Sequence, residues 1–166
     1  MSAIILRPEQ DGDADAIRTL SAAAYADTKY SDGSEPELID RLRNDGDLSL
    51  SLVAENEQGV VGHIAFSPVR IMDGTKGWFG LGPVSVASQL QGQRIGFSLV
   101  QRGIADMREM NANGIVVLGD PGYFGQFGFE NDPQLTFDGY QPELFQRLMF
   151  DGKPPKGAVI YSKAFS

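Results

Sequence analysis

The sequence predicts a single-domain α/β (α+β) fold, with a mixed central sheet of about six to seven strands flanked by helices. Three observations predict it: strand-like segments follow one another as hairpins, a long amphipathic helix comes next, and a buried strand follows that helix directly. Hairpins give antiparallel pairs, whereas a strand–helix–strand crossover gives a parallel pair. At 166 residues, without a repeat or a linker, the chain is expected to form one domain over residues 1–166.

The first third of the chain is predicted to hold a short strand and then two helices. Residues 3–7 form the predicted strand, and carboxylates suited to a helix start follow it. Ser34 and Glu37 are three residues apart, the spacing of a capping box, so the second helix is expected to begin there. Apolar residues recur at helical spacing as Ile17, Leu20 and Ala24 in the first helix, and as Leu38, Ile39 and Leu42 in the second.

The middle of the chain is predicted to be an antiparallel meander followed by a crossover. Residues 48–54, 60–69 and 78–86 are the predicted strands, separated by turn-forming residues. A helix from Ile95 to Met107 is expected to end before Asn113-Gly114, a pair suited to a left-handed cap. The remaining predicted elements are a buried strand at 115–118, an irregular or briefly helical segment at 121–128, a short helix at 142–150 and a last strand at 158–161.

Composition excludes several classes of function. The chain has no cysteine and one histidine, so we expect neither disulfides nor a metal site. The net charge of −8 disfavours nucleic acid and anionic lipid, and it suits a cationic small molecule or a basic peptide. Arg7 and Glu9 interrupt the N-terminal apolar run, and no stretch approaches the roughly 20 apolar residues of a membrane span. We therefore expect a cytoplasmic protein without membrane contact.

The segment from Gly80 to Gly96 holds the most informative residues. Gly80, Gly82 and Pro83 interrupt a strand-like run and indicate a bulge or a splayed edge. The turn from Gln91 to Gly96 then opens the strongest helix, and a glycine-bearing turn at a helix start is a natural phosphate site. A purely structural turn is the alternative. Neither a nucleotide-binding P-loop nor a complete dinucleotide fingerprint is present.

These residues resemble the GCN5-related N-acetyltransferase (GNAT) superfamily. Its pyrophosphate loop, Gln/Arg-x-x-Gly-x-Gly/Ala, is matched by Gln91, Arg94 and Gly96, with Arg94 in place of the first glycine. The strand from Leu81 to Val86 and the aromatic Gly-Phe segment from Phe124 to Phe129 also resemble family motifs. The order of elements fits from Ile4 to Ser166, and Leu-Gly-Asp-Pro before the Gly-Phe segment is similar to a bacterial branch of predicted N-acetyltransferases.

The resemblance implies an acyl-CoA N-acyltransferase fold that binds acetyl-CoA or another acyl-CoA as cosubstrate. Backbone groups of Val84 to Val86, with Ser85 between them, would pair with the pantetheine, and Phe124 would line it. The side chain of Arg94 would either crowd the phosphate or add a charge-assisted hydrogen bond, and we favour retained binding. The residues implied to cradle the pyrophosphate are Gln91, Gly92, Gln93, Arg94, Ile95 and Gly96.

Acyl transfer to an amine requires a proton acceptor for the attacking amine and a proton for the departing thiolate. Glu35 is the candidate base, because it lies where a loop meets a helix that should border the acceptor cleft. The alternative is a first-turn acid that stabilises the helix dipole. His63 could also accept a proton, although a structural histidine in a strand is the simpler interpretation.

The candidate acid is Tyr123. In the family a tyrosine often stands four residues before the glycine of the Gly-Phe pair, where this chain has Phe124. Tyr123 is adjacent, and its hydroxyl could protonate the thiolate. The alternative is that Tyr123 only packs and that the thiolate leaves unprotonated.

The sequence therefore favours an N-acyltransferase in which an amine of a small molecule or a peptide attacks the thioester directly. No cysteine is present to carry an acyl intermediate, and no nucleophile elbow supports serine chemistry. The alternative from another class is a noncatalytic module that binds or senses acyl-CoA. The acceptor amine and the choice between a monomer and a homodimer stay open at this stage.

Overall fold

The main sheet is mixed and has its long antiparallel strands on one side of a single parallel pair. The computed structural model describes residues 3–25 and 35–166, without the side chains of Tyr25, Glu35 and Pro36. Within these residues the strand order is β1-β2-β3-β5-β6-β9-β7. The strands are β1 (Ile5–Pro8), β2 (Leu50–Asn56), β3 (Gly59–Pro68), β5 (Trp78–Val86), β6 (Gly114–Leu118), β9 (Phe145–Met149) and β7 (Glu130–Asn131).

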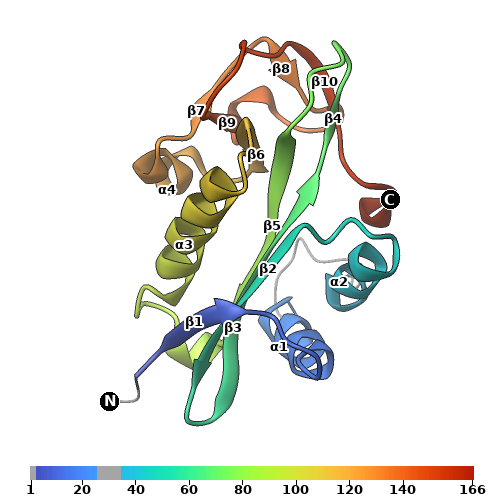
Figure 1. Cartoon of the computed structure of the whole chain (residues 1–166). Helices are drawn as coiled ribbons and strands as arrows, with labels where there is room; N and C mark the ends of the chain where they lie inside the picture. Colours follow the sequence, from blue (N-terminus) through green and yellow to red (C-terminus); the bar gives the residue numbers. More distant parts are fainter. Residues whose placement is uncertain (1–2, 26–34) are drawn as a thin grey trace.

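Helices cover both faces of this sheet. Figure 1 shows α3 on one side, and α1 and α2 on the other. The α-helices are α1 (Ala14–Tyr25), α2 (Glu35–Asn44), α3 (Ile95–Glu109) and α4 (Pro121–Phe124), and the short 3₁₀ segments are η1 (Ser88–Leu90), η2 (Gly125–Phe127), η3 (Pro142–Leu144) and η4 (Lys163–Phe165). The predicted α/β class, with a mixed central sheet and flanking helices, is confirmed.

The alternation of side chains along the strands explains the two apolar layers, one on each face of the sheet. On the α3 side, Leu52, Ile64 and Phe66 pack against Leu99 and Met107 in the largest apolar cluster. On the opposite side, Val53 and Ala65 pack against α1 and α2 through Ile17 and Ile39. Neighbouring residues of β2 and β3 thus belong to different layers, as the period of a strand requires.

The predicted meander and crossover are present. Strands β2, β3 and β5 pair antiparallel, and β5 pairs parallel with β6 across the connection that contains α3. Helix α2 begins at Glu35, as the sequence predicted, but Ser34 of the capping box lies outside the described residues.

The predicted helix at 142–150 is wrong. Residues 142–144 form only η3, and β9 follows at once. Phe145, Leu148 and Met149 have helical spacing, which misled the prediction. Strand β6 has backbone groups that need partners on the side of this segment. They pair with β9 in five antiparallel register pairs, from Leu118–Phe145 to Gly114–Met149. Pairing with a distant strand overrides local periodicity here.

The predicted last strand belongs to a second, smaller sheet. Strand β10 (Gly157–Ile160) lies between β4 (Arg70–Ile71) and β8 (Leu135–Thr136). The apolar side chains of this region, including Val69, Trp78 and Val159, form a cluster separate from the α3 layer. In the described ranges, no helix has both the length and the apolar character needed to cross a membrane.

A partly buried polar network holds α2 to the strands on the α1 side. The guanidinium of Arg43 donates to both carboxylate oxygens of Glu9, at 2.9 Å each. The Ser51 hydroxyl donates to Glu9 at 2.7 Å and lies 2.8 Å from Nε2 of His63. Because the serine proton is used on Glu9, Nε2 of His63 must be the donor to Ser51. Nε2 therefore carries a proton, and in the neutral ring it is the one ring nitrogen that does.

Burial favours that neutral state. His63 is fully buried, and desolvation lowers its pKa to about 4, with the carboxylate of Glu9 opposing the shift and the charge of Arg43 adding to it. These contacts make His63 a structural residue on the side of the sheet that α1 covers.

We predict that His63 makes stability depend on pH. Between about pH 6.5 and pH 4 the unfolded chain binds a proton that the folded chain excludes, so stability falls as pH drops through this window, by about 3 kcal/mol in total. His63→Gln keeps a donor near Nε2 but cannot titrate. Urea unfolding at pH 7 and pH 4.5 should show a smaller loss of stability for the variant than for the wild type. Equal losses in the two proteins would contradict the assignment.

Candidate active site

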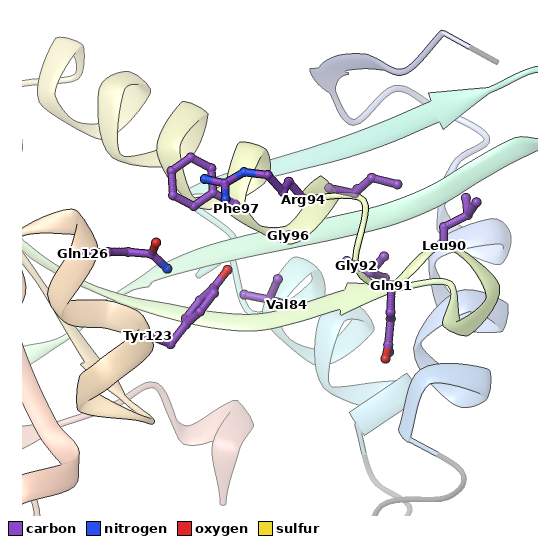
Figure 2. A pocket seen from close by; sticks show the side chains of 11 residues that line it. Val84, Leu90, Gln91, Gly92, Arg94, Gly96, Phe97, Tyr123 and Gln126 are labelled. Atoms are coloured by element: carbon purple, nitrogen blue, oxygen red, sulfur yellow. The ribbon is translucent and has the colours of Figure 1, made fainter. Parts of the chain in front are cut away.

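A groove lies where the end of β5, the start of α3 and α4 meet (Figure 2). Its volume is about 480 Å³, which is in the range of small-molecule sites. The lining residues come from β5, the turn that follows it, the first turn of α3 and the segment from α4 to η2. They are Val84, Val86, Leu90, Gln91, Gly92, Arg94, Ile95, Gly96, Phe97, Tyr123 and Gln126.

A bulge in β5 shapes one wall of the groove. The register with β3 runs from Ile64–Val84 to Phe66–Leu81, so β5 contains one residue more than β3 at this point. Gly82 has a φ of 136°, which favours glycine, and Pro83 cannot donate a backbone hydrogen bond. The predicted bulge is therefore confirmed.

The parallel pairing of β5 with β6 ends just before this bulge. The register covers Trp78–Gly114, Phe79–Ile115 and Gly80–Val116. Val117 and Leu118 continue β6 toward β9 without a register partner on β5. The two strands thus separate after Gly80, and Val84 and Val86 line the groove beyond the split.

The start of α3 presents amides to the groove. Gly92 has a φ of 89°, and a Cβ placed there would contact nothing within 4 Å, so the backbone conformation is what calls for glycine. Arg94, the N-cap residue, has a φ of 63° and makes no side-chain capping hydrogen bond to the described first turn. The first N–H groups of a helix have no partner inside the helix and lie at the positive end of its dipole. This end of the groove therefore suits an anion.

Arg94 adds a positive charge at the same place. Its guanidinium carbon lies 4.0 Å from the centre of the Phe97 ring. In Figure 2 the side chain extends along the first turn of α3 toward this ring, at the edge of the groove. A cation held against an aromatic face is well placed to meet a phosphate.

The opposite wall is formed by α4 and η2. Asp120 caps α4 by accepting a hydrogen bond from the backbone N–H of Gly122 at 3.1 Å. Tyr123 is 36% exposed, and its hydroxyl lies 3.7 Å from the position that a Cβ on Gly96 would occupy. Burial raises the pKa of Tyr123, and the charge of Arg94 opposes part of that rise. The hydroxyl thus keeps its proton at neutral pH and faces the start of α3.

Most residues predicted to bind the cosubstrate line this groove. Val84, Val86, Gln91, Gly92, Arg94, Ile95 and Gly96 do so, together with the acid candidate Tyr123. Three predicted residues do not. Ser85 is buried opposite His63 on the other face of the sheet, and Gln93 is exposed in the turn. Phe124 packs into the α3-side core, and its ring lies 2.5 Å from a Cβ built on Gly119.

The base candidate Glu35 is the first residue of α2, and its side chain lies outside the described residues. Sequence reasoning also missed three residues that line the groove: Leu90, Phe97 and Gln126. Helical spacing offered a signal for two of them, because Phe97 is three residues after Arg94 and Gln126 is three residues after Tyr123.

Comparison with known proteins places the chain in a family. The model of the acetyltransferase (GNAT) family matches residues 14–125. The N-acetyltransferase YhbS of Escherichia coli (strain K12) is 37% identical over 102 residues. That sequence match covers 61% of this chain and 61% of YhbS, so the aligned segment spans about three fifths of the length of this curated relative.

Two solved structures extend the similarity over the whole chain. A GNAT family acetyltransferase from Brucella melitensis, in complex with acetyl-CoA, is 43% identical, covers 99% of each chain and has a TM-score of 0.88. YhbS from Escherichia coli, in complex with CoA, is 30% identical, covers 99% of this chain and 93% of its own, and has a TM-score of 0.89. The fold thus agrees with the sequence matches, and the chain belongs to the acetyltransferase (GNAT) family.

Proposed function

We propose that the protein is an N-acyltransferase that transfers an acyl group, in the first place acetyl, from acyl-CoA to an amine of a small molecule or a peptide. The observation that carries this proposal is the groove in which the separated end of β5 meets the uncapped start of α3 beside Arg94. The acetyl-CoA and CoA present in the two similar solved structures support it. A cytoplasmic location is proposed on composition alone.

The residues of the groove fit an acyl-CoA. The amides at the start of α3 and the guanidinium of Arg94 would hold the pyrophosphate. Val84 and Val86 line the path from there toward the split between β5 and β6, where the pantetheine would run. A Cβ on Gly96 would lie 3.6 Å from Val86, so the glycine keeps that path open.

Transfer requires two proton movements besides the acyl step. The amine nitrogen bonds to the thioester carbonyl carbon, and the carbon–sulfur bond breaks with its electron pair on sulfur. The amine loses a proton to a base, for which we propose Glu35 or a water that it orients. The thiolate gains a proton, for which we propose the Tyr123 hydroxyl, because it stands in the groove and remains protonated at neutral pH.

We predict that acetyl-CoA stabilises the protein by binding at this groove. A ligand at roughly 100 times its dissociation constant adds about 2.7 kcal/mol to the stability of the native state. Thermal unfolding with acetyl-CoA, CoA and longer acyl-CoAs should therefore show a rise in Tm. The proposal fails if none of these ligands shifts Tm.

Gly96→Glu tests the position of the phosphate. The Cβ itself is tolerated, but the carboxylate would extend into the groove beside the proposed pyrophosphate, so the shift in Tm should disappear. Gln101→Glu is the matched control, because it adds the same charge on an exposed position of α3 away from the groove and should keep the shift. A folded Gly96→Glu variant that binds normally would place the phosphate elsewhere.

We predict that Glu35→Gln lowers kcat by about 10²- to 10⁴-fold, the usual contribution of a general base. Binding of acetyl-CoA should be unchanged, because the residue is proposed to serve the amine. Turnover with a reactive amine from about pH 6 to 10 provides the measurement. A variant with the rate profile of the wild type would assign the base role to solvent or to another acid.

We predict that Tyr123→Phe lowers turnover at least about tenfold and leaves the acetyl-CoA shift in Tm intact, because general acid catalysis is worth about 10²- to 10⁴-fold. An unchanged rate would show that the thiolate leaves without this proton.

A screen of amines separates transfer from simple binding. Release of CoA that depends on an amine supports the acyltransferase. A shift in Tm without release for any amine would favour the noncatalytic acyl-CoA-binding module.

A further inference from the structure

Arg94 has a backbone conformation that its residue type rarely adopts. In the described ranges, two residues other than glycine have a positive φ: Arg94 at 63° and Asn111 at 65°. Asparagine tolerates the left-handed region because its short polar side chain bonds locally, whereas arginine has no such advantage. A backbone held in a sparsely populated region points to a functional reason for the side chain that it carries. The conformation favours glycine here, so the presence of an arginine needs an explanation.

The guanidinium of Arg94 is held by an aromatic ring, and its N–H donors are free. Its central carbon lies 4.0 Å from the centre of the Phe97 ring, three residues later in the chain (Figure 2). Within the described residues, no ion pair or side-chain hydrogen bond involves this guanidinium. Arg7, Arg43 and Arg147, by contrast, each pair with two carboxylates. A guanidinium has five N–H donors and no acceptor, so the donors of Arg94 are available to an anion.

The Phe97 ring is itself braced by the opposite wall of the groove. Its centre lies 5.0 Å from that of Phe127 in η2, and the Phe127 ring lies 5.6 Å from that of Tyr123 in α4. Phe97 is partly buried and lines the groove together with Arg94 and Tyr123. Packed contacts therefore run from the guanidinium through two rings to α4, and they fix the ring that holds the charge.

The guanidinium and the helix amides form two neighbouring groups of donors. The amides belong to the first turn of α3, whereas the guanidinium lies over the ring of a residue three positions past the N-cap, about 4.5 Å along the helix axis. The amides of a helix start can bind one phosphate group by themselves. A planar guanidinium suits a further phosphate group. The two groups of donors together fit a pyrophosphate better than a single phosphate.

Resting on the acyl-CoA binding proposed above, we infer that Phe97 is a positioning residue, which holds the guanidinium of Arg94 in place for the pyrophosphate. Through this pair the protein selects donors with two linked phosphates. Thioesters of coenzyme A are such donors, whereas thioesters of 4′-phosphopantetheine, which carry one phosphate, are not.

The charge of the whole chain makes a local cation important for such a ligand. The net charge of −8 repels every polyanionic donor that approaches the protein. Among the residues that line the groove, Arg94 carries the one formal positive charge. An arginine that replaces glycine in this turn therefore offsets the repulsion at the place where the phosphates would bind.

The first test titrates CoA, dephospho-CoA, 4′-phosphopantetheine and pantetheine into the wild-type protein and into Arg94→Gly. The variant should bind CoA and dephospho-CoA about tenfold or more weakly, because it loses charge-assisted hydrogen bonds to the pyrophosphate. Its affinity for 4′-phosphopantetheine and pantetheine should not change. Equal losses for all these ligands, or tighter binding of CoA, would overturn the inference. A loss with CoA alone would assign Arg94 to the 3′-phosphate and would overturn the pyrophosphate assignment.

The same variant separates this role from a structural one. Glycine adopts the left-handed conformation without steric cost, so Arg94→Gly should not lower the Tm of the protein without ligand. An arginine that only fastens the start of α3 would show the reverse, with a lower Tm and an unchanged affinity for CoA. That result would overturn the inference.

Phe97→Leu tests the positioning role. Leucine keeps an apolar side chain against Phe127 but offers no aromatic face to the cation, so the affinity for CoA should fall about two- to fivefold relative to that for pantetheine. Phe97→Tyr keeps the aromatic face and is the matched control, which should retain the wild-type ratio of the two affinities. An unchanged ratio in Phe97→Leu would show that Phe97 does not position Arg94.

The double variant shows whether Phe97 acts through Arg94. Arg94→Gly removes the guanidinium, so adding Phe97→Leu to it should leave the ratio of affinities for CoA and pantetheine unchanged. A fall of the same size in both backgrounds would show that the ring meets CoA directly, and it would overturn the positioning role.

The failure of this inference differs from the failure of the proposed function. If CoA binds and an amine releases it from acetyl-CoA, but Arg94→Gly keeps the preference for CoA over pantetheine, only the inference is overturned. The absence of any binding of CoA or acetyl-CoA to the wild-type protein overturns both.

Discussion

The arrangement of the molecule depends on the point at which β5 stops pairing with β6. Three parallel register pairs join the strands, and the bulge between Leu81 and Val84 then turns β5 away. Backbone N–H and C=O groups inside a sheet need hydrogen-bond partners. Where a strand leaves its neighbour, these groups must therefore bond to something else. On the α3 side the departure opens the groove lined by Val84 and Val86, and on the other side it places Gly80 beneath the Tyr161 ring.

The groove works only if the start of α3 is held at a fixed place over this split. Close packing achieves that. A Cβ on Gly103 of α3 would lie 2.5 Å from the Phe66 ring, and one on Gly62 of β3 would lie 3.0 Å from Ile95 and Leu99. Helix and sheet therefore approach each other at two glycines, and the buried face of α3 fixes the direction of its amides. The core of the protein thus positions the amides of the proposed anion site, and Arg94 adds its guanidinium beside them.

Local chemistry made part of the fold and site predictable. The bulge at Gly82-Pro83 and the turn at Gln91–Gly96 follow from residues that restrict the backbone, and the structure contains both. Features that depend on distant partners were not predictable in this way. The helical spacing of 145–149 concealed a strand because the edge of β6 lies far away in sequence. Phe124 holds the family position of the acid, yet its ring fills the space beside Gly119 in the core. The ring of Phe137 stacks on those of Tyr140 and Tyr161, although no periodicity links these three positions.

Unpartnered buried groups have different meanings in different parts of this fold. The described core also contains Ser21, Ser67, Ser85 and Trp78 with unpartnered polar atoms, and Nδ1 of His63 is another. Nε2 of the same histidine donates to Ser51, which in turn donates to Glu9, so that ring is already fixed by the fold. Tyr161 differs in its position, because its ring lies against Gly80 at the strand split, and Phe137 packs between it and the half-exposed ring of Tyr140. At Tyr161 the packed rings separate the hydroxyl from solvent, and burial is the main reason that the hydroxyl stays neutral.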